Sequence, residues 1–168
     1  SLNIPTIRLA EKLSIDKVLL TAQNLGISTL ELNSKEANDK NLAASIGGLT
    51  NGVTVLDMAG AYSAFANHGV YTKPTAIVKV VDRKGKTIYE HTPETKQVLS
   101  ERTATLLTDM LEDVITKRAQ VKLLISIDLL LVKQELQIII KMLGLQVIHL
   151  ILVTVVWMGC DDNDVMPG

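Results

Sequence analysis

The sequence predicts a mixed α/β fold of the α+β kind, and three observations lead to that prediction. Apolar residues recur at helical spacing in two stretches, residues 54–67 and 100–116. Between them, strand-like runs at 76–82 and 87–90 flank the turn Asp82-Arg83-Lys84-Gly85, which predicts a β-hairpin. Residues 121–156 are mostly Leu, Ile and Val with no clear period, and because these residues favour strands, a β-strand can form there.

Length and composition indicate one folded domain. The chain has 168 residues, of which 47% are apolar and 21% charged, a balance that argues against disorder. The net charge of −1 gives no broad attraction to nucleic acid or to an anionic membrane. A lone Cys160 cannot form an internal disulfide.

The apolar stretch 143–157 is shorter than the roughly 18 residues of a spanning helix and contains Gln146 and His149, so we expect no transmembrane segment. The start at Ser1, without a methionine or a signal peptide, leads us to expect a cut inside a longer protein.

Ahead of residue 54 the sequence predicts shorter elements, placed by caps, prolines and glycines. They are, in order, a helix at 4–13 with Pro5 in its first turn, a helix at 16–25 capped by Ser14 or Asp16 and ended by Gly26, a polar loop at 33–40, and turns at Gly47-Gly48 and Asn51-Gly52.

The stretch 54–67 is the clearest helix. Thr54 is placed to cap it, Asp57 stands at the third helical position of a capping box, and Gly69 follows its end. Small residues along it permit close packing on both sides, so we expect this helix to be buried. The apolar face predicted for the helix at 100–116 consists of Leu106, Leu107, Met110, Leu111, Val114 and Ile115.

Residues 46–82 resemble a segment of the class A penicillin-binding proteins. The stretch reads Ile-Gly-Gly-Leu-Thr-Asn-Gly-Val-Thr-Val-Leu-Asp-Met-Ala-Gly-Ala-Tyr-Ser-Ala-Phe-Ala-Asn-His-Gly, followed by Tyr-Thr-Lys-Pro and a strand that ends Val-Val-Asp. Upstream, Ser1-Leu2-Asn3 resembles the Ser-x-Asn element of the same family, in the expected order and at a plausible distance. Trp157-Met158-Gly159 and Asp161-Asp162-Asn163 resemble the family again near the end.

The resemblance implies a partial serine β-lactamase/transpeptidase-like fold, with helices packed on an antiparallel sheet. It implies a peptidoglycan D,D-transpeptidase, in which a Ser-x-x-Lys serine forms an acyl-enzyme with a stem peptide and a second stem peptide resolves it. Penicillin and other β-lactams would enter the same site. By resemblance, Ser1 relays protons near the lysine and the Asn3 amide holds the substrate, whereas the nucleophile would lie upstream of Ser1. No cofactor is implied.

The third family element, Lys-Thr-Gly, is not written in this chain. Lys133 falls close to its lysine but lacks the following Thr and Gly, and we assign it to substrate binding. Codons can be chosen for 118–122 such that the frame two bases later reads Gly-Thr-Gly-Lys. Codons chosen for 132–149 read, in that same frame, Lys-Thr-Gly-Thr-Thr-Asn-Asn-Asn-Lys-Asn-Ala-Trp-Leu-Ala-Gly-Tyr-Thr. We therefore favour a frameshift near Lys117 and a compensating one near Leu152 over a diverged apolar tail.

The predicted organisation is one partial transpeptidase domain over 1–168. Within it, 1–117 is family-like, 118–153 departs from the family and 154–168 is family-like again. Such a chain would be inactive as an enzyme, and the alternative is a non-catalytic relative that binds peptidoglycan or a partner protein. An unrelated α/β binding module is the third possibility.

His68 is interpreted as a helix-end residue, and the histidines and Cys160 share no metal-ligand spacing. By resemblance, the parent protein would act on the extracytoplasmic face of the bacterial cytoplasmic membrane.

Overall fold

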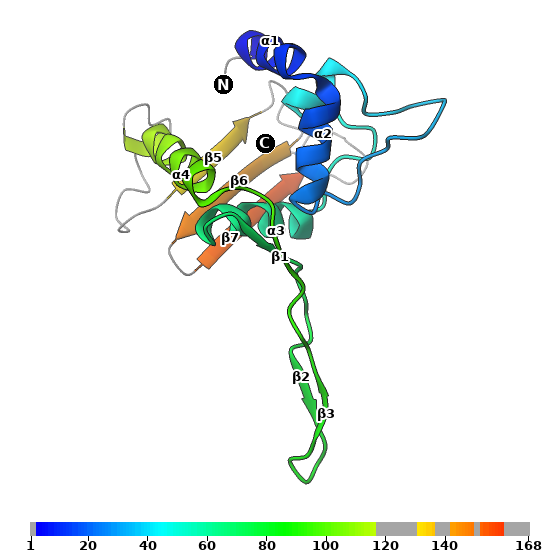
Figure 1. Ribbon diagram of the computed structural model, residues 1–168, viewed down its shortest axis with the longest axis vertical. Helices are drawn as coiled ribbons and strands as arrows, with labels where there is room; N and C mark the ends of the chain where they lie inside the picture. Colours follow the sequence, from blue (N-terminus) through cyan, green and yellow to red (C-terminus); the bar gives the residue numbers. More distant parts are fainter. Residues whose placement is uncertain (1–2, 117–130, 137–141, 150–151, 160–168) are drawn as a thin grey trace.

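The computed structural model describes residues 3–116, 131–136, 142–149 and 152–159, with side chains described for 3–112 and 152–157. Two helices pack on a three-stranded antiparallel sheet, two further helices lie at one end, and a two-stranded hairpin projects from the opposite end (Figure 1). The α+β class predicted from the sequence, with helices on an antiparallel sheet, is therefore confirmed.

The sheet runs in the order β5-β6-β7, with both pairs of strands antiparallel. Its strands are β5 (Leu131–Leu136), β6 (Met142–His149) and β7 (Leu152–Gly159). In this register Lys133 pairs with Gln146, and Gln146 pairs with Val155 on its other side. Helix α3 (Val55–Ala66) packs against β6 and β7, while α4 (Glu101–Thr116) packs against β5 and against α3.

Tyr62 of α3 forms the centre of the core. Its ring meets that of Phe65 edge-on, with the ring centroids 5.5 Å apart and the planes at 87°, a favoured geometry for an aromatic pair. Leu111 of α4 and Val153 of β7 pack against the same ring. One side chain thus joins both helices to the sheet.

Helix α3 begins as the sequence predicts, because the Thr54 hydroxyl accepts a hydrogen bond from the Asp57 N–H at 3.0 Å. Its buried residues are Gly60, Ala61, Tyr62 and Ala64. The prediction that the whole helix is buried is wrong at Leu56, whose side chain is 61% exposed. Leu56 lies in the first turn and lines an open groove instead of the core.

Helices α1 (Asn3–Leu13) and α2 (Ile15–Asn24) match the two predicted ones to within about a residue at each end. Both pack against the short 3₁₀ helix η1 (Leu42–Ile46). The predicted side-chain cap at Ser14 is wrong: this residue stands at the N-cap position but makes no capping hydrogen bond. A one-residue link between α1 and α2 holds Ser14 at φ +76°, whereas a capping side chain needs an extended backbone.

The hairpin consists of β2 (Lys79–Val81) and β3 (Thr87–Glu90), and it projects from the body (Figure 1). Its turn is tied by the Asp82 carboxylate, which accepts hydrogen bonds from the N–H groups of Lys84 and Lys86 at 2.8 and 2.9 Å. A second pair of strands was not predicted. Strands β1 (Val70–Thr72) and β4 (Thr95–Gln97) pair antiparallel at the base of the hairpin.

Helix α4 begins after Ser100, whose hydroxyl accepts a hydrogen bond from the Thr103 N–H at 3.1 Å. The predicted apolar face is only partly covered, since Leu106 is 55% and Met110 65% exposed. The principal neighbours of α4 are α3 and β5. These two elements cover one side of α4, and the covered surface is narrower than the apolar face of the helix.

Candidate functional site

Of the predicted Ser-x-Asn element, the structure describes Asn3. This residue opens α1 and its side chain is exposed, as a substrate-binding amide would need to be. Ser1 lies outside the described residues. The position of Asn3 depends on α1, which rests on η1 and α2.

Lys133 lies in the third position of β5, paired in register with Gln146. A strand at this position agrees with the sequence expectation. Strand β5 has β6 and α4 as its main neighbours, whereas α1 has η1 and α2. The elements that carry Asn3 and Lys133 therefore belong to different parts of the fold, and their roles as site residues stay predictions.

The letters Ser-x-x-Lys occur once in the chain, at Ser14-Ile15-Asp16-Lys17. They stand after Ser-x-Asn, the reverse of the order that the resemblance implies. Both side chains are exposed. In the part of the chain that the structure describes, no serine hydroxyl is hydrogen-bonded to a lysine amine, so Ser14 lacks the adjacent base that a serine nucleophile requires.

Asp39, within the polar loop predicted at 33–40, is a fully buried carboxylate. Its Oδ2 accepts a hydrogen bond from the Glu31 N–H and its Oδ1 accepts one from the Thr50 N–H, each at 2.7 Å. Burial by itself raises the pKa of Asp39, but the hydrogen bonds from Thr50 and then Glu31 outweigh it and hold the pKa below its ordinary value. A single Asp in a polar run carries no periodic signal, which is why sequence analysis could not single it out.

Asp57 fulfils only half of the predicted capping box. Its N–H donates to Thr54, but its carboxylate does not return to the Thr54 backbone. Instead, Asp57 Oδ2 accepts hydrogen bonds from the N–H and the hydroxyl of Ser28, at 2.9 and 2.7 Å. A partner 29 residues away has replaced the local one.

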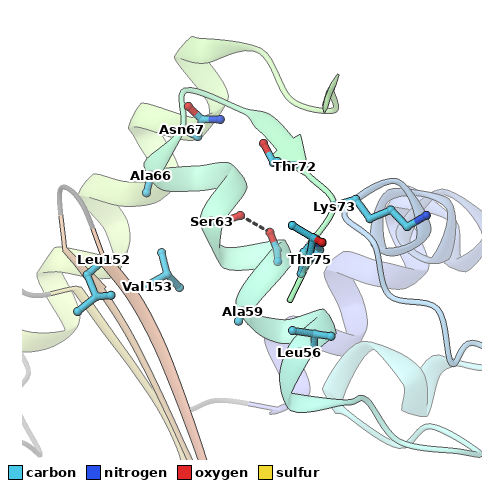
Figure 2. A pocket seen from close by; sticks show the side chains of 12 residues that line it. Leu56, Ala59, Ser63, Ala66, Asn67, Thr72, Lys73, Thr75, Leu152 and Val153 are labelled. Atoms are coloured by element: carbon cyan, nitrogen blue, oxygen red, sulfur yellow. Dashed lines mark hydrogen bonds between the residues drawn. The ribbon is translucent and has the colours of Figure 1, made fainter. Parts of the chain in front are cut away.

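An open groove of about 520 Å³ lies beside α3, lined also by Leu152 and Val153 of β7 and by the segment 72–75 (Figure 2). The serine and the lysine that line it already have structural partners. The Ser63 hydroxyl donates to the Gly60 carbonyl at 2.6 Å, and the Lys73 amine pairs with the Glu94 carboxylate at 3.3 Å. The Ser63 hydroxyl, with the Gly60 carbonyl as its partner, therefore lacks the adjacent base that a serine nucleophile requires.

His68 follows the end of α3, as expected, at φ +52°, and its ring pairs with the Glu101 carboxylate at 3.3 Å on the surface. Within the described ranges there is no group of three or more His, Cys, Asp or Glu side chains that could hold a metal ion. None of the helices described is long and apolar enough to cross a membrane.

Comparison with known proteins adds the family. The family described as penicillin binding protein transpeptidase domain matches residues 1–125. Penicillin-binding protein 1F of Bacillus subtilis is 39% identical over 101 residues, which cover 58% of this chain and 14% of that protein. Penicillin-binding protein 4 of the same organism is 36% identical over 115 residues, 68% of this chain and 18% of that protein. The chain thus spans less than a fifth of the length of these relatives.

Solved structures show the same fold. The crystal structure of penicillin-binding protein 1A from Haemophilus influenzae has a TM-score of 0.78 at 21% identity, over 96% of this chain and 29% of that one. The PonA1 protein of Mycobacterium tuberculosis, in complex with penicillin V, has a TM-score of 0.66 at 20% identity, over 85% of this chain and 40% of that one. The fold is thus that of the penicillin-binding transpeptidases, and the chain belongs to the penicillin-binding protein transpeptidase family.

Proposed function

We propose that this chain is a section of a peptidoglycan D,D-transpeptidase, the enzyme that cross-links cell-wall stem peptides through an acyl-serine and is acylated by β-lactams. The observation that carries the proposal is the family match over residues 1–125, within which residues 46–82 include α3 and β2, the first strand of the hairpin. Two of the solved structures with this fold are acyl-enzyme complexes with imipenem and ceftriaxone. The parent protein would act on the extracytoplasmic face of the cytoplasmic membrane.

In this proposal Asn3 holds the substrate's peptide group and Ser1 relays protons. Lys133 takes the place of the Lys-Thr-Gly lysine on β5. The exposed amide of Asn3 at the start of α1 supports the first assignment. The strand at Lys133 supports the last, because the resemblance implies a β-strand at that element.

We further propose that the chain as written does not form an acyl-enzyme. Its one Ser-x-x-Lys, at Ser14, has no lysine hydrogen-bonded to the serine and stands on the wrong side of Ser-x-Asn. A serine without an adjacent base or a depressed pKa is a weak nucleophile.

The test is labelling with fluorescent penicillin, followed by denaturing electrophoresis and intact mass. Full-length penicillin-binding protein 1F of Bacillus subtilis is the positive control. We expect no covalent adduct on this chain. An adduct that disappears in Ser14→Ala would identify Ser14 as a nucleophile and refute the inactivity. Retention on purified peptidoglycan without acylation would instead support the non-catalytic relative.

We also propose that residues 118–153 arise from a shifted reading frame between family-like segments at 1–117 and 154–168. The family match ends at 125, close to the proposed shift. Sequencing the gene from an independent clone decides this. The shifted frame should spell Lys-Thr-Gly-Thr-Thr over residues 132 to 137; any other reading would make 118–153 a diverged tail.

A further inference from the structure

Asp39 is the largest fully buried side chain among the described residues, and none of the ion pairs between described side chains includes it. A buried carboxylate is unfavourable unless hydrogen bonds replace its water shell. Here two backbone N–H groups do so, from Glu31 on one side and Thr50 on the other, each at 2.7 Å. Charge-assisted hydrogen bonds of this kind are about twice as strong as neutral ones.

These bonds close a loop. The Asp39 N–H also donates to the Glu31 carbonyl at 2.8 Å, and its carbonyl accepts from the Asn41 N–H at 2.7 Å. Asn41 in turn caps η1, because its side-chain oxygen accepts from the Ala43 N–H at 3.0 Å. The Thr50 N–H donates to the Asp39 carboxylate, so residues 39–50 form a loop whose two ends are joined at Asp39. This loop contains η1.

The closed loop supports α1. Helix α1 packs mainly against η1 and then against α2, so η1 is the principal surface on which α1 rests. Asn3 is the first residue of α1. A displacement of η1 would therefore move or loosen the helix whose first residue is the motif asparagine.

We propose that Asp39 is a positioning residue for the Ser-x-Asn segment: by clamping Glu31 to Thr50 it fixes η1, and η1 fixes the orientation of α1 and Asn3. The importance of this for substrate binding rests on the role proposed for Asn3 above. Asp39 itself is fully buried, so its effect on Asn3 passes through η1 and α1.

The test is hydrogen–deuterium exchange by mass spectrometry on the full chain, without any β-lactam. In Asp39→Ala we expect protection of backbone amides in α1 and η1 to fall about tenfold or more, because two charge-assisted bonds are lost. Asparagine has nearly the same shape as aspartate and keeps one side-chain oxygen. Asp39→Asn should therefore retain one of the two hydrogen bonds and lose less protection in α1 and η1 than Asp39→Ala. Amides of α4, which has no part in the clamp, serve as the internal reference and should change less than about twofold.

Asp57→Ala is the matched control, since it too removes a carboxylate that accepts two hydrogen bonds. It should loosen Ser28 and the first turn of α3, while α1 and η1 stay within about twofold. The proposal is overturned if Asp39→Ala and Asp39→Asn leave α1 and η1 unchanged. It is also overturned if α4 loses protection equally in both variants, because Asp39 would then support the whole fold. Penicillin labelling plays no part in this measurement, so failure of the proposed function would leave its result unaffected.

Discussion

The carboxylate of Asp57 accepts both hydrogen bonds that Ser28 donates, from its N–H at 2.9 Å and from its hydroxyl at 2.7 Å. This contact fastens the segment after α2 to the first turn of α3. The two segments are joined again where the Thr29 hydroxyl donates to the Gly52 carbonyl at 2.6 Å. A negative charge in the first turn of α3 also interacts favourably with the helix dipole.

We predict that Ser28→Ala lowers the free energy of unfolding by about 0.5–1 kcal/mol, because one hydrogen bond on the surface is lost. Asp57→Ala should lower it by about 1–2 kcal/mol, because both bonds and the charge at the helix N-terminus are lost. Urea unfolding of the two variants and of the double variant measures this. If the two effects added fully in the double variant, the two residues would not be energetically coupled.

Because the carboxylate of Asp39 is buried and hydrogen-bonded, we predict that the chain loses stability at acidic pH. Its pKa in the folded chain lies below the ordinary value of 3.8, through the hydrogen bonds of Thr50 and Glu31 that outweigh its burial. Its contribution to stability is therefore complete above the unfolded-state pKa and is lost as the pH falls from about 4 through the folded-state pKa. Urea unfolding at a series of pH values should show a shallower loss below pH 4 in Asp39→Asn than in the parent chain. Parallel curves would contradict the prediction.

Gly26 and Gly47 have nearly the same φ angle, so substitutions at these two positions distinguish backbone strain from a steric clash with a neighbouring side chain. Gly26 has φ +92° and Gly47 has φ +95°, but a methyl group added at Gly26 would collide with the Tyr71 ring, whereas at Gly47 it would meet open space. We predict that Gly47→Ala costs about 1–2 kcal/mol from the left-handed backbone alone. Gly26→Ala should cost about 1–3 kcal/mol more, since Tyr71 must move. Thermal unfolding of both variants measures the difference, and equal losses would show that Tyr71 yields freely.

We expect substitutions at the two N-cap residues Thr54 and Ser14 to affect stability differently. Thr54→Ala removes the hydroxyl that accepts the Asp57 N–H and should lower stability by about 1 kcal/mol. Ser14 makes no capping bond and is held at φ +76°. Ser14→Ala should therefore change stability little, and Ser14→Gly should raise it by about 0.5–1 kcal/mol, because glycine adopts this angle without strain. Chemical unfolding checks all three variants. A clear loss in Ser14→Ala would mean that its hydroxyl stabilises the α1–α2 junction.

Local signals were sufficient for the helices and the hairpin. Thr54 caps α3, and Asp82 ties the turn between β2 and β3, because each acts on backbone groups only a few residues away. The pairing of β1 with β4 could not be read in this way. Each strand has three residues, too few for a periodic pattern, and its partner lies far away in the sequence, as Val70 and Gln97 show.

The sequence by itself determined the family, the start of α3 and the turn of the hairpin, since these depend on residue types at short spacing. Only the tertiary structure decided which side chains are covered and which distant groups meet. It left Leu56 and Met110 exposed on faces that looked apolar, and it gave the carboxylate of Asp57 to Ser28 in place of Thr54. It also buried Asp39 between Glu31 and Thr50. The physical reason is that burial and long-range hydrogen bonding depend on which elements pack together, and spacing along the chain carries no record of that.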